Sequence, residues 1–119
     1  MSASSYLFVL TEAPYGNERV YNGLRLAGSL AKRDGTAVKV FLIGDAAACA
    51  KSGQKVPQGY YNVQTMLSAV ARRGGKIGVC GTCMDARGIA SEELVEGAHR
   101  STMDELTDWV ATSDQVLVF

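Results

Sequence analysis

Hydrophobic residues gather in short continuous runs along the chain, and polar residues and glycines separate these runs. Short runs that are rich in β-branched residues are typical of strands covered on both faces of a parallel sheet. A turn follows one of them directly, where Gly44-Asp45 comes after Ile43. The pattern predicts four strands, at residues 6–10, 37–43, 76–79 and 115–119.

Three segments between the strands instead show the period of an amphipathic helix, with apolar residues three or four positions apart. N-caps and glycine stops set their expected bounds. The first runs from about residue 18 to 33 between Asn17 and Gly35, the second runs from Asn62 to Gly74, and the third begins with Thr102 and Glu105 as a capping box. A shorter helix over residues 46–51, capped by Asp45, is expected after the second strand.

Strands that alternate with helices predict a parallel sheet with right-handed crossovers. We therefore expect an α/β fold, a three-layer α/β/α sandwich around a mainly parallel sheet of four to five strands, in one domain over residues 1–119. The fifth strand is expected at Leu94-Val95, after a helical start at residues 91–93. Residues 52–61 form the longest irregular segment, and such a loop in a small domain is expected to be functional or interfacial.

The composition and the net charge argue against several classes of protein. Twelve basic residues balance twelve acidic ones, so no overall field draws the chain to nucleic acid or to an anionic membrane. No apolar run approaches the ~20 residues that span a bilayer, and the first residues lack the basic and apolar regions of a signal peptide. Three cysteines, an odd number, fit a reducing compartment better than a disulfide framework. We expect a cytoplasmic protein that binds neither nucleic acid nor membrane directly.

The strongest chemical signal is the Cys-x-x-Cys pair of Cys80 and Cys83, which follows the strand at 76–79. Ligands of open α/β sheets bind outside the carboxyl ends of the strands. Residues 84–87 can form a helical turn, and helix amides together with Arg87 would stabilise a thiolate at this edge. We expect Arg87 to lower the pKa of Cys80.

Other loops end at the same edge of a parallel sheet, because all its strands point the same way. The loops after the first two strands contain polar residues that become candidate neighbours of Cys80: Glu12, Tyr15, Asn17 and Asp45. Cys49 lies among alanines and is expected to pack, His99 is expected to be exposed, and Trp109 is expected in the core or in a subunit interface.

The Cys-x-x-Cys pair has four interpretations. A zinc site normally needs four ligands, and only Cys49 and His99 remain to complete one. The others are a thioredoxin-type disulfide, two small buried side chains, and a nucleophilic cysteine that carries sulfur. The chain has neither the three-glycine dinucleotide fingerprint nor a phosphate loop. We therefore expect no metal and no organic cofactor.

Several motifs occur in order over nearly the whole chain: Pro14-Tyr15-Gly16, residues 22–27, residues 40–45, residues 59–62, residues 80–88 and the ending at 116–119. Together they resemble the DsrE/DsrF-like family, and the block at 80–88 is most similar to its YchN branch. The resemblance implies a small α/β sandwich that assembles into homotrimers or homohexamers. It also implies that one cysteine near the end of a central strand accepts and passes on a persulfide, a position that falls on Cys80. Cys83 is an addition relative to the family's sulfur-relay members.

The leading hypothesis is a persulfide carrier, a possible sulfurtransferase, in which Cys80 takes sulfur from a donor and a partner's thiol then accepts it. Donor and acceptor would be proteins or small persulfides. The residues expected to act are Cys80, Cys83 and Arg87 in the chemistry, and Glu12, Tyr15, Asn17, Gly81 and Thr82 in substrate binding, with Gly81 allowing close approach. Two alternatives stay open: a non-catalytic ligand-binding or assembly protein of the same fold, and a dithiol redox module that uses both cysteines.

Overall fold

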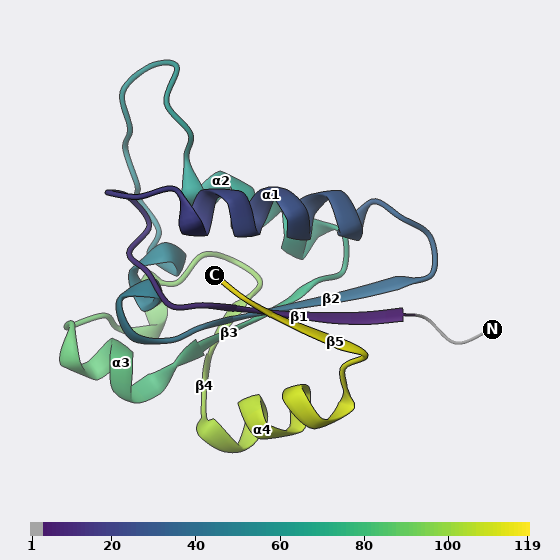
Figure 1. The fold of residues 1–119 in the computed structure, drawn as a ribbon. Helices are drawn as coiled ribbons and strands as arrows, with labels where there is room; N and C mark the ends of the chain where they lie inside the picture. Colours follow the sequence, from purple (N-terminus) through teal and green to yellow (C-terminus); the bar gives the residue numbers. More distant parts are fainter. Residues whose placement is uncertain (1–3) are drawn as a thin grey trace.

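The computed structural model describes residues 4–119, in which strands and helices alternate along the chain (Figure 1). All four predicted strands and all three predicted longer helices are confirmed, each within about two residues of its expected bounds. The elements are β1 (Ser4–Leu10), α1 (Arg19–Ala31), β2 (Thr36–Leu42), the 3₁₀ helix η1 (Gly44–Ala50), α2 (Val63–Arg72), β3 (Lys76–Cys80), α3 (Gly81–Ala86), the 3₁₀ helix η2 (Ser91–Glu93), β4 (Ala98–Ser101), α4 (Met103–Thr112) and β5 (Gln115–Val118).

The five strands form one sheet in the order β4-β3-β2-β1-β5, and every neighbouring pair is parallel. Helices α1 and α2 cover one face of this sheet and α4 lies on the other (Figure 1). The predicted three-layer α/β/α sandwich is therefore confirmed. Because all strands are parallel, their carboxyl ends lie at one edge, and β3 reaches that edge between β2 and β4.

Alternate residues of the central strands fill two separate cores, as the two-residue period of a strand requires. Phe8 faces the larger core beneath α1 and α2, while Leu7 and Phe41 face a smaller one beneath α4. Trp109 of α4 closes the smaller core, with its ring edge-on to Phe41 at 6.2 Å between centroids. Trp109 is 8% exposed, which confirms its expected place in the core.

The expected fifth strand at Leu94-Val95 is wrong: the strand beside β3 is β4, at Ala98–Ser101. Leu94 forms an isolated antiparallel bridge with Lys51, and Val95 is buried. β4 lies at the edge of the sheet and exposes His99 and Arg100. Edge strands tolerate charged side chains, so a search for continuous apolar runs does not find them.

Of the predicted caps of α1 and α2, the cap of α2 is confirmed and the cap of α1 differs by one residue. Asn62 caps α2 as expected, since its Oδ1 accepts from the amide of Thr65 at 3.1 Å. At α1 the N-cap is Glu18, one residue later than expected, although Asn17 Oδ1 still accepts from the amide of Arg19 at 3.0 Å. α1 also ends at Ala31, two residues earlier than expected.

Two further caps differ from the sequence prediction. Thr102 Oγ1 accepts from the amide of Glu105 at 3.2 Å, but the Glu105 carboxylate turns to Ser101 and His99, so the reciprocal half of the capping box is not formed. Asp45 does not cap η1, which begins after Ile43; Asp45 lies in its first turn instead.

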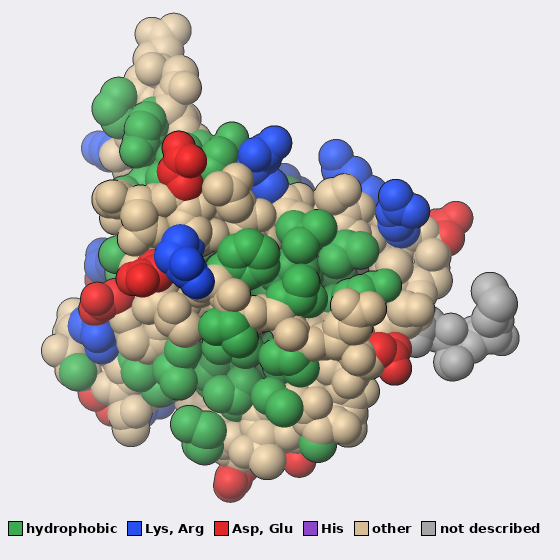
Figure 2. All heavy atoms as spheres, viewed as in Figure 1, with side chains coloured by type: hydrophobic (Ala, Val, Ile, Leu, Met, Phe, Trp, Pro, Cys, Tyr) green, Lys and Arg blue, Asp and Glu red, His purple; other side chains and the backbone are tan. Residues whose placement is uncertain are grey.

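The surface has two notable features. The loop over residues 52–62 projects from the body of the molecule beside α2 (Figure 1). The edge strand β5 exposes Val116 and Val118, at 41% and 60%, and Figure 2 shows hydrophobic side chains gathered on the face where β5 lies. No helix within residues 4–119 has the length and apolar character needed to cross a membrane.

Candidate functional site

Cys80 and Cys83 lie at the point where β3 passes directly into α3. Cys80 is the last residue of the strand and the N-cap of the helix, and Cys83 follows one turn later. Side chains three residues apart share a helix face, so the two thiols meet. The Cys83 thiol donates a hydrogen bond to Cys80 Sγ at 2.7 Å, and both cysteines are partly exposed.

The surroundings of Cys80 favour its thiolate. Burial by itself raises the pKa of Cys80, but hydrogen bonds outweigh that effect and lower the pKa overall. They come from the Cys83 thiol, from the Thr82 hydroxyl at 3.4 Å, and from the backbone amides of both residues. Cys80 is therefore the thiol of the pair that ionises first.

Cys83 shifts in the opposite direction. Burial raises the pKa of Cys83, and so does its hydrogen bond to Cys80, because that bond uses the Cys83 proton. The amide of Gly44, which donates to Cys83 Sγ at 3.2 Å, and the charge of Arg87 lower this pKa without reversing the net rise. The pair thus favours ionisation of Cys80 over ionisation of Cys83.

The third cysteine is inert by comparison. Cys49 has no exposed surface, and burial raises its pKa to about 12. Its weak thiol hydrogen bond goes to the backbone carbonyl of Glu12 at 3.8 Å. This confirms that Cys49 packs in the core.

Arg87 faces Cys83 and not Cys80. Its Nε and one terminal nitrogen bind Asp45 at 3.1 and 2.7 Å, and the other terminal nitrogen donates to the carbonyl of Cys83 at 3.1 Å. The groups that shift the pKa of Cys80 most belong to the turn that follows it, whereas the charge of Arg87 acts on Cys83. The charge of Arg87 thus lowers the pKa of Cys83, and its expected effect on the pKa of Cys80 stays a prediction.

The cation beside Cys80 is Arg100, which the sequence analysis missed. β4 pairs with β3 so that Cys80 lies opposite Ser101, and Arg100 comes just before it. The Arg100 guanidinium makes a two-pronged ion pair with Asp85 of α3, at 2.8 and 2.9 Å. The pKa of Arg100 is raised, first by Asp85 and further by the charge of Cys80.

Gly81 makes room for this guanidinium. A Cβ built on Gly81 would lie 2.9 Å from both Cζ and Nε of Arg100, a distance that forces the arginine to move. The expected role of Gly81 was to let a partner approach, whereas the group that approaches it is an arginine of the same chain. The sequence could have predicted this contact between Gly81 and Arg100, but only with β4 placed at residues 98–101.

A hollow of about 260 Å³ opens next to the Cys80 sulfur. Apolar surface dominates it, and its polar groups are Arg100 and short hydroxyl side chains. The lining residues are Phe41, Cys80, Gly81, Thr82, Arg100, Ser101, Thr102 and Met103. A volume just below that of pockets for drug-sized ligands suits a small molecule or the end of a longer chain.

Two of the remaining predicted site residues, Tyr15 and Asn17, contact the projecting loop and the start of α2. The hydroxyl of Tyr15 donates to Gln54 at 2.7 Å and accepts from the amide of Val63 at 3.0 Å. The backbone carbonyl of Asn17 accepts from the hydroxyl of Tyr61 at 3.4 Å. Glu12 instead contacts Cys49 through its backbone carbonyl. The substrate-binding roles of Glu12, Tyr15 and Asn17 stay predictions.

Metal ligands do not converge in the part of the chain that the structure describes. Among residues 4–119 no three or more His, Cys, Asp or Glu side chains are grouped so that they could hold an ion. His99 is exposed, as expected, and contacts Glu105.

Comparisons of the sequence and of the fold with known proteins point to the same relatives. The protein YchN of Escherichia coli K12 is 37% identical over 95% of this chain and 97% of its own. An uncharacterized protein of Methanopyrus kandleri is 40% identical, over 93% and 90% of the two chains. The crystal structure of Escherichia coli YchN matches with a TM-score of 0.92 at 36% identity, over 98% and 99% of the two chains. The model of the DsrE/DsrF-like family matches residues 4–119, and the chain therefore belongs to this family.

Proposed function

We propose that the protein carries sulfur as a persulfide on Cys80, between a donor persulfide and an acceptor thiol. The observation that carries the proposal is the contact of two thiols whose pKa values shift in opposite directions, down at Cys80 and up at Cys83. The thiolate is the nucleophilic form of cysteine, so the pair offers one nucleophile at the edge of the sheet. Membership in the DsrE/DsrF-like family agrees with this kind of chemistry.

Loading and unloading are two exchanges of the same type. The Cys80 thiolate attacks the outer sulfur of a donor R–S–SH, the new Cys80–sulfur bond forms, and the donor's sulfur–sulfur bond breaks to release RS⁻. An acceptor thiolate then attacks the outer sulfur of Cys80–S–SH and leaves with it, which restores the Cys80 thiolate. No electron is gained or lost overall, and neither step calls for a metal or an organic cofactor.

The residues around Cys80 fit these steps. The amides of Thr82 and Cys83 and the Thr82 hydroxyl already bind the sulfur anion, and they can bind the charge of a persulfide at the same place. Arg100 adds a positive charge beside the hollow in which the donor's outer sulfur would lie. Phe41 and Met103 give the hollow an apolar wall against which a donor's carbon chain could pack.

A second function, dithiol chemistry, is favoured by the 2.7 Å distance between the two sulfur atoms. After loading, deprotonated Cys83 can attack the inner sulfur of the Cys80 persulfide. The Cys80–Cys83 disulfide then forms as the bond to the outer sulfur breaks and HS⁻ leaves. A dithiol reductant of the thioredoxin class would have to reduce that disulfide before the next cycle.

Intact-mass measurement after incubation with a small persulfide donor tests the proposal. We expect one added sulfur on the wild type and on Cys49→Ser, and none on Cys80→Ser. Cys83→Ser separates the two functions: a carrier keeps its added sulfur equally long with and without Cys83, whereas a dithiol protein keeps it longer in this variant, because the attack that releases sulfide is gone. Equal and slow reaction of Cys80 and Cys49 with an alkylating reagent near neutral pH would instead support a non-catalytic protein of this fold.

A further inference from the structure

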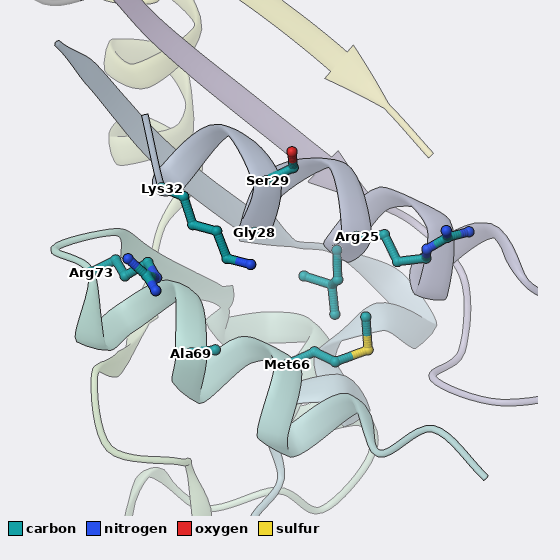
Figure 3. Close-up of a pocket in the computed structure, with 8 residues that line it drawn as sticks. Arg25, Gly28, Ser29, Lys32, Met66, Ala69 and Arg73 are labelled. Atoms are coloured by element: carbon teal, nitrogen blue, oxygen red, sulfur yellow. The ribbon is translucent and has the colours of Figure 1, made fainter. Parts of the chain in front are cut away.

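A second hollow lies between α1 and α2 (Figure 3). These helices cover the face of the sheet opposite α4 (Figure 1). It has a volume of about 310 Å³. We call it the α1–α2 groove, and its lining residues are Leu24, Arg25, Gly28, Ser29, Lys32, Met66, Ala69 and Arg73. Phe41 of the Cys80 hollow packs instead beneath α4, so the sheet separates the two sites.

The groove exists because small residues face each other at its centre. Gly28 of α1 and Ala69 of α2 stand between longer side chains at both ends (Figure 3). A Cβ added to Gly28 would meet nothing within 4 Å, so packing within the chain does not require a glycine there. Glycine inside a helix costs about 1 kcal/mol relative to alanine. The chain thus keeps an open space at a cost in stability.

Positive charge surrounds the groove, although the chain as a whole is neutral. Neither α1 nor α2 contains an aspartate or a glutamate. Lys32 and Arg73 lie together at one end (Figure 3), and neither forms an ion pair with any residue in the described range 4–119. Arg25 lies at the other end, over the ring of Tyr21. Helix dipoles favour cations at these helix ends, but they do not explain the hollow between them.

The floor of the groove is apolar and aliphatic, formed by Leu24, Met66 and Ala69. Its length follows from α1: Leu24 and Lys32 are eight residues apart, which is about 12 Å of helix at the usual rise per residue. It has no aromatic ring on which a nucleic-acid base could stack. An apolar strip of this length that ends in two cations complements a short chain with one anionic end.

We propose that the α1–α2 groove binds an amphipathic anion, a linear apolar chain that ends in a carboxylate or phosphate group. The apolar chain lies over Leu24 and Met66, and the anionic end lies between Lys32 and Arg73. This site is independent of the sulfur chemistry proposed for Cys80. Free fatty acids and anionic lipid headgroups share this chemistry, and the experiment below separates them.

The test uses octanoate as the probe, with amide NMR spectra of isotope-labelled protein as the readout. We expect shifts confined to α1 and α2, and weaker binding of both 1-octanol and acetate, because each lacks one half of the recognised group. Cys80→Ser should bind octanoate as the wild type does, so a failure of the sulfur-carrier proposal leaves this result unaffected. Phosphatidylglycerol vesicles test the alternative source. If the protein sediments with these vesicles, and the groove variants (Lys32→Glu with Arg73→Glu, and Gly28→Leu) abolish that sedimentation, the site binds a lipid headgroup.

Two matched pairs of variants localise the site. Lys32→Glu with Arg73→Glu should weaken octanoate binding by about tenfold or more. Arg33→Glu with Arg72→Glu changes the net charge equally outside the groove and should weaken binding much less. Gly28→Leu should abolish binding by filling the space, whereas Ala111→Leu, at an exposed position of α4, should not. Shifts elsewhere, equal binding of 1-octanol, equal effects of the two charge pairs, or no shifts at all would each overturn the proposal.

Discussion

Replacing Cys83 with alanine should make Cys80 less reactive at low pH and more reactive at high pH. The substitution removes the thiol that donates to Cys80 Sγ at 2.7 Å and leaves the Thr82 and backbone donors in place. A hydrogen bond to a charged group contributes about 1.5–3 kcal/mol, and the low end applies because Cys80 is partly exposed. That energy corresponds to about tenfold less thiolate at a pH well below the Cys80 pKa.

Two effects of opposite sign set the measured rate. The more basic thiolate of the variant is also the better nucleophile, and a Brønsted coefficient of about 0.4–0.5 makes it roughly threefold faster per thiolate. The alkylation rate should therefore fall by about threefold at low pH and rise by about threefold at high pH, so that the two pH profiles cross. Stopped-flow alkylation with iodoacetamide, in a Cys49→Ala background, measures the rate in both the low-pH and the high-pH range.

Cys83→Ser is the matched control, because a hydroxyl keeps a donor at the same position. Its profile should lie close to that of the wild type. Superimposable profiles of Cys83→Ala and wild type, in folded protein, would refute the reasoning and leave the Thr82 hydroxyl and the backbone amides as the source of the lowered pKa of Cys80.

Four further predictions follow from other parts of the structure. Gly81→Ala should displace Arg100. Loss of this nearby positive charge should lower the ratio of iodoacetate to iodoacetamide reactivity at Cys80 by at least about twofold. An unchanged ratio would show that Arg100 does not act on Cys80. The exposed β5 edge should be covered by further copies of the chain, so light scattering should give a trimer or hexamer, and Val118→Lys should lower that mass; a wild-type mass of 12.6 kDa contradicts it. Gly28→Ala should raise the free energy of unfolding by up to about 1 kcal/mol in urea titrations. Hydrogen bonds from Ser101 and His99 outweigh burial and lower the pKa of Glu105, so stability should be lost as the pH falls below 4.5, with a smaller loss in Glu105→Gln.

The buried strands were predictable because burial on both faces leaves a continuous apolar run in the sequence. The position of Cys80 was predictable for a related reason, since a residue that directly follows a strand of a parallel sheet must lie at the carboxyl edge. Asn62 was predictable as a cap because its role depends only on the next three residues. These features depend on local sequence or on the direction of the chain.

The partners of the charged residues were not predictable in the same way. Arg87 binds Asp45, which is 42 residues away in the sequence, and Arg100 reaches Gly81 only because β4 pairs with β3 in one register. β4 itself is short, polar and at the edge of the sheet, so its sequence lacks the apolar run that marks the other strands. An error of four residues in the position of that strand was enough to hide the arginine beside Cys80.

The site therefore combines groups from two separate stretches of the chain. The hydrogen bonds that lower the pKa of Cys80 come from Thr82 and Cys83, in the first turn of α3. The positive charge and the hollow come from β4 and the start of α4, which belong to a different stretch of the chain. Changes in β4 would thus alter the charge and shape of the hollow beside Cys80, and through Arg100 they would also affect how readily Cys80 ionises. If the protein carries sulfur, this one strand would influence both which partner fits and how reactive the nucleophile is.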